Sequence, residues 1–243
     1  MKKIFFALAR LFENRGALRS LLIWPKFSIT SYNMLCALRN QAVLPGSVID
    51  VGANVGQFAV AAAKIFPDAR VYSFEPNPDC LVQLRKNTAG LGNVSVHPLA
   101  LGEQTGEVAF HLNSYSLSSS ILPLANSHRA AFPYAQEIGT IKVKMDTLNH
   151  FFDEVLLPRP ALLKLDIQGY EAQALRGAGV LLKQIDYVVL EASFKPMYQG
   201  ECLFMEITEL MKGMGFVFVR PLAWASDPKS GEIVQMDALF QRD

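Results

Sequence analysis

The sequence predicts an α/β domain with a central, mostly parallel sheet, helices on both faces and an antiparallel edge strand. Short apolar, β-branched runs alternate with helical patterns over residues 48–98 and again over 161–214. This alternation is typical of right-handed βαβ units in a parallel sheet. Two final strands, expected at 216–220 and 238–241, would form the antiparallel edge.

Composition and charge exclude several classes of protein. A chain of 243 residues, 51% hydrophobic and 19% charged, is expected to form one substantial folded domain rather than a disordered segment. The net charge of +1 lacks the footprint of a general nucleic-acid binder, so no nucleic-acid partner is expected. The scattered Cys and His residues show no metal-ligand spacing, which favours a reducing, cytoplasmic location and no structural metal.

Residues 1–45 are predicted to form a helical N-terminal extension, with breaks near Gly16 and Pro25, before the α/β domain at 46–243. The apolar run at the start of the chain is too short for a signal peptide or a membrane span. Apolar residues recur there at helical spacing among Lys and Arg residues: Phe5, Leu8, Leu11 and Phe12. The pattern fits a helix packed on the domain or on a partner. It also fits a helix lying on the inner face of a membrane.

The first βα unit carries the most informative motif, Asp-Val-Gly-Ala-Asn-Val-Gly-Gln-Phe at 50–58. A strand ends in a tight turn and a helix begins near Gln57, so backbone N–H groups and a helix N-terminus would face a ligand. The next strand, at 71–74, is followed by Glu75, whose carboxylate could accept hydrogen bonds from ribose hydroxyls. We therefore expect an adenosine-containing cofactor. A helix at 78–87 and a strand at 94–98 complete this half of the sheet.

The glycine spacing selects among such cofactors. A dinucleotide fold needs G-x-G-x-x-G, but the three positions here hold Gly52, Asn54 and Gln57. Asp50 would repel a phosphate, and it suits a ligand that carries an ammonium and a sulfonium. We therefore expect S-adenosylmethionine. The alternatives are a nicotinamide or flavin cofactor, or a turn that binds no ligand.

The α/β alternation is interrupted by an insertion at about 105–146. Strands are expected at 107–112 and 140–145, as antiparallel partners or edge strands. About 25 residues without a predicted element lie between them, which is long for a connection in a compact domain. Such a stretch is often a lid or a binding loop. Contact with the substrate is one interpretation, and a mobile insertion is the other.

The alternation resumes with an apolar strand at 161–167 that contains charged residues. Lys164, Asp166 and Gln168 alternate, so their side chains are expected on one face. Because buried charges are costly unless paired, a purely structural Lys164–Asp166 ion pair is one interpretation. In the other, Asp166 reaches the crevice at the carboxyl ends of the strands and acts on the acceptor. Glu171 is expected to begin the next helix for structural reasons, near the positive end of its dipole. The remaining elements are expected at 170–182, 187–191 and 201–214.

Four motifs together resemble the FkbM-type methyltransferases. They lie at 50–58, 74–78, 99–102 and 163–171, in the order and at distances that suit that family. The resemblance covers about 48–191 and implies a class I methyltransferase (Rossmann-like) fold that uses S-adenosylmethionine. It also implies O-methylation of a hydroxyl, on a sugar of a glycoconjugate or on a secondary metabolite. The acceptor is thus expected to be a small molecule or a glycan.

The resemblance assigns roles to individual residues. The residues expected to bind the cofactor are Asp50, Gly52, Ala53, Asn54, Gly56, Phe58, Glu75, Pro76, Asn77, Ala100 and Leu101. The glycine-containing turn would wrap the methionine end of the cofactor. Glu75 would hold the ribose, and Ala100 and Leu101 would border the adenine.

The same resemblance puts Asp166 and Gln168 near the transferred methyl group as catalytic residues, with Asp166 as the base for the acceptor hydroxyl. The sequence has no dedicated metal motif. A divalent ion held by Asp166 with Glu171 or Glu191 is the alternative. An RNA or DNA methyltransferase is disfavoured, because base-amino methylation commonly uses Asn/Asp-Pro-Pro-aromatic where this chain has Asp-Ile-Gln-Gly at 166–169. A non-catalytic, cofactor-binding or membrane-associated protein is a further alternative.

Overall fold

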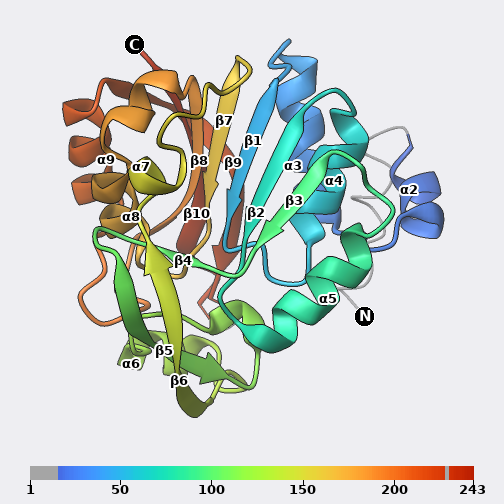
Figure 1. The fold of residues 1–243 in the computed structure, drawn as a ribbon. Coiled ribbons are helices and arrows are strands. Elements are labelled where there is room, and N and C mark those ends of the chain that lie inside the picture. The colour runs from blue at the N-terminus through green and yellow to red at the C-terminus, as the bar shows by residue number, and fades with distance from the viewer. Residues whose placement is uncertain (1–15, 228–229) are drawn as a thin grey trace.

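A computed structural model describes residues 16–227 and 230–243 of the chain. Its centre is a seven-stranded sheet with the order β3-β2-β1-β7-β8-β10-β9 (Figure 1). The strands are β1 (Ser47–Val51), β2 (Arg70–Phe74), β3 (Val94–His97), β7 (Ala161–Leu165), β8 (Tyr187–Ser193), β9 (Phe216–Ser226) and β10 (Ile233–Arg242). The first five run parallel, whereas β10 pairs antiparallel with both β8 and β9. The predicted fold class is therefore confirmed.

Helices cover both faces of this sheet (Figure 1). One face is covered by α3 (Ile29–Asn40), α4 (Gln57–Ile65) and α5 (Pro78–Thr88), with α2 (Ala17–Ile23) packed against α3. The other face is covered by α7 (Leu148–Phe151), α8 (Glu171–Ala178), the 3-10 helix η2 (Gly179–Gln184) and α9 (Phe204–Gly213). The single helix expected at 170–182 is thus two helices. They are divided at Gly179, whose positive φ of 49° interrupts the α-helical backbone.

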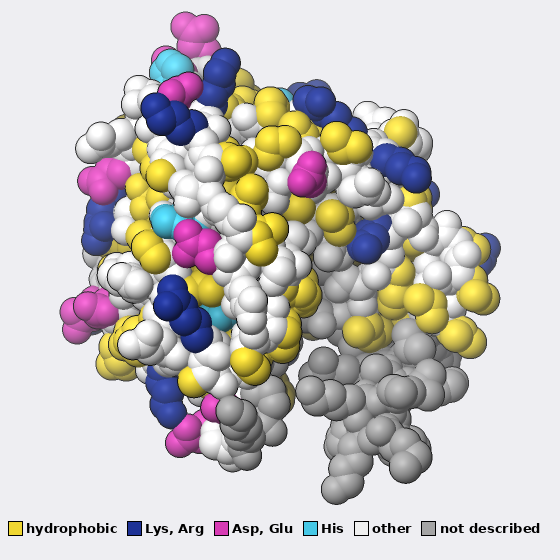
Figure 2. Space-filling view, turned by 90° about the horizontal axis from the view of Figure 1, so that it is seen from below, with side chains coloured by type: hydrophobic (Ala, Val, Ile, Leu, Met, Phe, Trp, Pro, Cys, Tyr) yellow, Lys and Arg dark blue, Asp and Glu magenta, His cyan; other side chains and the backbone are white. Residues whose placement is uncertain are grey.

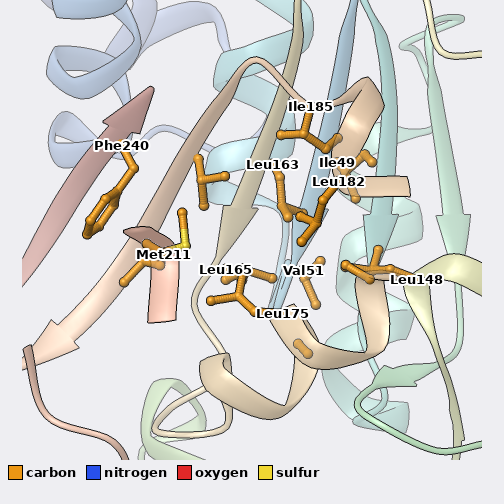
Figure 3. Close-up of a cluster of buried hydrophobic side chains, with 14 of the residues drawn as sticks. Ile49, Val51, Leu148, Leu163, Leu165, Leu175, Leu182, Ile185, Met211 and Phe240 are labelled. Atoms are coloured by element: carbon orange, nitrogen blue, oxygen red, sulfur yellow. The ribbon is translucent and has the colours of Figure 1, made fainter. Parts of the chain in front are cut away.

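The central strands β1 and β7 lie in the core, and all their residues are buried. Ile49, Val51, Leu163 and Leu165 pack with Leu175 of α8 on one face of the sheet (Figure 3). Burying one such side chain fully contributes roughly 1.5–3 kcal/mol. The burial of β1 and β7 on both faces explains their nearly continuous apolar sequences.

Helix α3 lies in the predicted helical N-terminal extension and packs on the opposite face of the sheet. Leu35 and Leu38 are fully buried and pack against Val48 of β1. The helix begins after Ser28, whose hydroxyl accepts a hydrogen bond from the backbone N–H of Ser31 at 3.2 Å. The amphipathic pattern at 5–12 lies outside the described residues. No helix in the described part of the chain is both long and apolar enough to cross a membrane.

The insertion forms a second sheet below the first one (Figure 1). Its strands are β4 (Ala100–Leu101), β5 (Gly106–Asn113) and β6 (Glu137–Asp146), in the order β4-β6-β5. The pair β5–β6 is antiparallel, as expected, and β4 joins β6 in parallel. Between β5 and β6 lie the 3-10 helix η1 (Ser116–Ser118) and α6 (Asn126–Ala131), where no element was predicted. The segment is anchored to the main sheet, because the Ser120 hydroxyl donates to the backbone oxygen of Gln168 at 2.7 Å.

Candidate active site

The turn after β1 is held in a geometry that only glycine tolerates. Gly52 has a φ of 80°, and a Cβ there would lie 1.9 Å from the backbone oxygen of Asp166. Gly56 has a φ of 95° and begins α4, where a Cβ would lie 2.9 Å from Leu84. Both glycines therefore let the turn pass close to its neighbours. The carboxyl ends of β1 and β7 meet at this turn.

Glu75 follows β2 and faces the same crevice. Its two carboxylate oxygens accept hydrogen bonds from the backbone N–H groups of Asn54 and Asn77, each at 2.8 Å. Burial raises the pKa of Glu75 to about 7, even though these two hydrogen bonds favour the charged form. The carboxylate keeps unused lone pairs for a further hydrogen-bond donor.

Two cavities meet at this crevice. The first encloses about 550 Å³, counting space open to solvent, and runs from Glu75 to Asp166. Its other lining residues are Val51, Gly52, Asn54, Pro76, Leu99, Ala100, Leu101, Phe110, Ser116, Leu117, Ser119, Ile121, Ile167 and Gln168. One wall is thus apolar, and part of it comes from the insertion.

The second cavity, of about 680 Å³ by the same measure, lies beside α3 and α4. It shares Gly52, Asn54, Leu117 and Asp166 with the first cavity. Its own lining residues are Ser28, Thr30, Ser31, Met34, Ala53, Gln57, Phe58, Lys164 and Asp237. Hydroxyls at the start of α3 therefore share this cavity with the carboxylates of Asp166, just after β7, and Asp237, within β10.

A buried cluster of charges supports the wall between the cavities. The Lys164 ammonium lies 3.2 Å from Asp50 and 3.3 Å from Asp166. Burial alone would lower the pKa of Lys164, but the two carboxylates outweigh it and the pKa is raised. Asp50 is fully buried, whereas the Asp166 side chain keeps 31% of its surface exposed. Lys164 therefore stays charged, and Asp166 is the member of the cluster that a ligand can reach.

Gln168 connects Asp166 to a second carboxylate. Its side-chain amide donates to Asp166 at 2.7 Å and to Glu191 at 2.8 Å, while its amide oxygen accepts from the Tyr198 hydroxyl. Gln235 also donates to Glu191, at 2.9 Å. Burial, followed by the charge of Asp166, raises the pKa of Glu191 well above its usual value. These bonds fix the orientation of the Asp166 carboxylate.

Most of the predicted site residues come together at the two cavities. The first cavity is lined by Gly52, Asn54, Glu75, Pro76, Ala100, Leu101, Asp166 and Gln168, and the second adds Ala53 and Phe58. Asp50, Gly56 and Asn77 line neither cavity. Asp50 lies beneath Lys164, and Asn77 caps α5 by accepting from the backbone N–H of Asp79 at 3.0 Å.

Several residues of the site have no recognisable signal in the sequence: Ser28, Thr30, Ser31, Met34, Tyr198, Gln235 and Asp237. They come from the first half of α3 and its N-cap, the loop after β8 and strand β10, all outside the motifs. Among the described residues, no group of three or more His, Cys, Asp or Glu side chains is arranged to hold a metal ion. Glu171 is buried and accepts a hydrogen bond from the backbone N–H of Ile167 at 2.9 Å, which is a structural role.

The comparison with protein families shows to which family the chain belongs. The model of the methyltransferase FkbM domain matches residues 50–218. The chain belongs to this family. It is a methyltransferase that depends on S-adenosylmethionine. Helix α3 and Asp237, which line the second cavity, lie outside the matched residues.

Two relatives each match 70% of this chain. The 2-O-methyltransferase NoeI of Sinorhizobium fredii is 25% identical over 177 residues, which cover 70% of this chain and 72% of that protein. The hexuronic acid methyltransferase AglP of Haloferax volcanii is 26% identical over 179 residues, which cover 70% and 69%. Among solved structures, magnesium protoporphyrin IX methyltransferase from Synechocystis PCC 6803 is 14% identical, with a TM-score of 0.49, and the match covers 88% of this chain and 78% of that one. A similarity of that size carries no conclusion about the acceptor.

Proposed function

We propose that this FkbM methyltransferase transfers the methyl group of S-adenosylmethionine to a hydroxyl oxygen, on a sugar of a glycoconjugate or on a secondary metabolite. The observation that carries the proposal is the position of Asp166, a partly exposed carboxylate in the wall shared by both cavities. The names of NoeI and AglP, a 2-O-methyltransferase and a hexuronic acid methyltransferase, support a hydroxylated acceptor.

The two cavities fit the two ends of the cofactor. Glu75 would accept from the ribose hydroxyls, and the apolar side chains of Leu101, Phe110 and Ile121 would border the adenine. At the other end, Asp237 lines the second cavity, and its carboxylate suits an ammonium. The hydroxyls at the start of α3 line the same cavity and suit the cofactor's own carboxylate, which the positive end of the helix dipole also favours.

The protein's own groups would then act on the acceptor. When bound, the cofactor supplies a methyl group on a positively charged sulfur. Asp166 accepts the proton of the attacking hydroxyl, a contribution of roughly 10²–10⁴-fold in rate. Gln168 and Lys164 hold the Asp166 carboxylate in place. Leu117 of the insertion covers both cavities and helps to exclude water, which favours an aligned displacement.

Calorimetry with S-adenosylmethionine tests the cofactor site. Glu75→Gln keeps the shape of the side chain but removes its charge, so the Kd should rise about 10- to 100-fold. Glu107→Gln, on an exposed position of β5, is the matched control and should leave the Kd unchanged. Equal affinity of the two variants would remove Glu75 from the site. The Gly52→Val variant is a poorer test, because its side chain would collide with the Asp166 backbone and disturb the fold.

We also propose peripheral contact with the inner face of a membrane. Helix α2 exposes an apolar surface made of Leu18, Leu21, Leu22 and Ile23, with 45–78% of each residue accessible. Residues 1–26 contain six Lys or Arg and a single Glu, a charge pattern that suits anionic lipids. Co-sedimentation with phosphatidylglycerol vesicles should occur and should weaken for Leu22→Glu. Equal recovery with and without vesicles would contradict this contact.

A further inference from the structure

Two exposed tyrosines of the insertion pack against each other. Tyr115 has 43% and Tyr134 has 59% of its surface exposed, and their ring centroids lie 5.5 Å apart at an angle of 85°. Tyr115 directly precedes Ser116 and Leu117, which line the first cavity. Tyr115 therefore adjoins the wall of the first cavity, and Tyr134 packs against it.

Hydrogen bonds hold this pair in place. The Ser114 hydroxyl donates to the backbone oxygen of Tyr134 at 2.9 Å and accepts from the backbone N–H of Gln136 at 3.0 Å. The backbone N–H of Ser114 donates to the Gln136 oxygen at 2.8 Å. The two segments that carry the tyrosines are thus tied to each other, so the ring arrangement is a property of the folded insertion.

The Tyr115 phenol also lies within electrostatic range of the candidate base. Burial, the neighbouring Tyr134 and the Asp166 carboxylate all raise the pKa of Tyr115. Directly after Tyr115, the Ser116 hydroxyl accepts a hydrogen bond from the Asn54 side chain at 3.3 Å, so Tyr115 adjoins the turn at the crevice. Neither tyrosine belongs to a hydrophobic core cluster of the described chain, although the Tyr134 ring also lies 6.0 Å from the ring of Phe132.

The chemistry of the pair favours one class of ligand. A tyrosine offers an apolar ring face and a polar hydroxyl at its tip. A pyranose ring matches this combination, with C–H groups on its face and hydroxyls around its edge. Lys and Arg side chains are scattered over the described part of the face seen from below, rather than gathered into one basic patch (Figure 2). An anionic polymer would find little to bind there.

We propose that Tyr115 and Tyr134 form a carbohydrate platform that holds a sugar ring of the acceptor, with one of its hydroxyls directed to Asp166. This inference rests on the proposed O-methyltransferase function. It narrows the acceptor to a sugar or glycoconjugate, and it assigns the part of the insertion around the tyrosines to the acceptor.

The test uses the full chain loaded with S-adenosylhomocysteine and a panel of methyl glycosides of glucose, galactose, mannose, fucose, N-acetylglucosamine and glucuronate. Saturation-transfer NMR measures binding of each glycoside, and transfer of labelled methyl from S-adenosylmethionine measures turnover. For a glycoside that binds, Tyr115→Ala or Tyr134→Ala should raise the KM about tenfold, with kcat within about twofold. Tyr→Phe at either position keeps the ring face and should retain most of the affinity.

Trp224→Ala is the matched control, because Trp224 is a 54% exposed aromatic residue on the edge strand β9. It should leave the KM unchanged. Unchanged binding of a glycoside in both tyrosine-to-alanine variants overturns the platform. So does the absence of binding and transfer for the whole panel. If the cofactor still binds and a non-sugar hydroxyl compound is methylated, the proposed function stands and only the carbohydrate inference fails.

Discussion

The two faces of the central sheet are equally buried, yet they differ in chemistry. Toward α7, α8 and α9, strands β1 and β7 present no charged side chain, and Ile49 and Leu163 are typical of that face. Toward α3 and α4, the same strands present Val48 and Leu162 at one end. At the carboxyl end of that face they present Asp50 and Lys164 as neighbours in register. Burial alone therefore does not explain why Asp50 and Lys164 occupy these positions, because the same two strands present no charged side chain on the equally buried opposite face.

The energetics make the same point. Replacing a buried ion pair by apolar side chains of similar volume is often neutral or stabilising, whereas removing one partner is strongly destabilising. The cluster of Asp50, Lys164 and Asp166 is thus a poor device for stability alone. We interpret it as a support that holds Asp166 at the crevice in a fixed position. Three predictions test this interpretation on the charged face, and a fourth concerns the part of the insertion that covers this face.

The largest effect is expected for Lys164→Met, which leaves Asp50 buried without a cation. The free energy of unfolding should fall by about 3–5 kcal/mol. Urea denaturation measures this, with Leu163→Ala on the apolar face as the reference for an ordinary core truncation, at about 2–5 kcal/mol. The double variant Asp50→Asn with Lys164→Met should regain stability but lose turnover, because Asp166 no longer has its support. A normal kcat in that folded double variant would reduce the cluster to a structural feature.

Asp166→Asn should separate catalysis from stability. The variant keeps the shape of the side chain, and Lys164 keeps Asp50 as its partner, so the thermal midpoint should change little. Loss of the base should lower kcat by roughly 10²–10⁴-fold with nearly normal cofactor affinity. Asp153→Asn, at an exposed position, serves as the control. A large fall in thermal midpoint with normal kcat per folded molecule would instead identify Asp166 as a structural counter-ion.

The charged face should also make stability depend on pH. Burial, with the charge of Asp166 adding to it, raises the pKa of Asp237 to about 7, and burial raises that of Glu75 to about 7. Below pH 7 the folded protein then holds protons that the unfolded chain has released. Stability should therefore fall as the pH rises from about 4.5 to 7, by about 1.4 kcal/mol per pH unit for each group.

Urea midpoints at pH 5, 6, 7 and 8 measure this dependence. Asp237→Asn removes one of the two groups and should flatten the curve, whereas Glu209→Gln, exposed on α9, should not. A curve that rises between pH 5 and 7 in the unmodified protein would show that these carboxylates are charged and stabilised in the fold.

The smallest effect is expected from a change in the part of the insertion that covers the charged half of the sheet. The sequence suggested that residues 113–139 cover the acceptor, but Ser116 and Leu117 also line the cavity beside Glu75. Leu117→Ala should therefore raise the Kd for S-adenosylmethionine about three- to tenfold, as well as affecting the acceptor. Leu22→Ala, an exposed leucine far along the chain on α2, is the control. If Leu117→Ala keeps wild-type affinity for the cofactor but alters the acceptor KM, this segment covers the acceptor alone, as the sequence suggested.

The parts of the site that the sequence predicted are those encoded by local pattern. The turn at Gly52 and Gly56, the acid after β2 and Asp166 after β7 all follow apolar strands, and strands of a parallel sheet end at one edge. The insertion was less predictable. Its two strands alternate clearly, but η1 and α6 are short and Ser-rich or polar, and they are held by contacts such as Ser120 with Gln168. Such contacts depend on residues distant in the chain.

The sequence by itself determined the fold class, the family and the cofactor, because periodicity and motif spacing are local properties of the chain. Only the tertiary structure decided which charges meet. It paired Lys164 with Asp50 as well as Asp166, brought Tyr198 to Gln168, and set Asp237 in the wall of the second cavity. The physical reason is that a buried charge or amide takes its partner from whatever strand or loop packs beside it. That neighbour is fixed by the sheet order and by side-chain packing, and neither is written in the residues next to it.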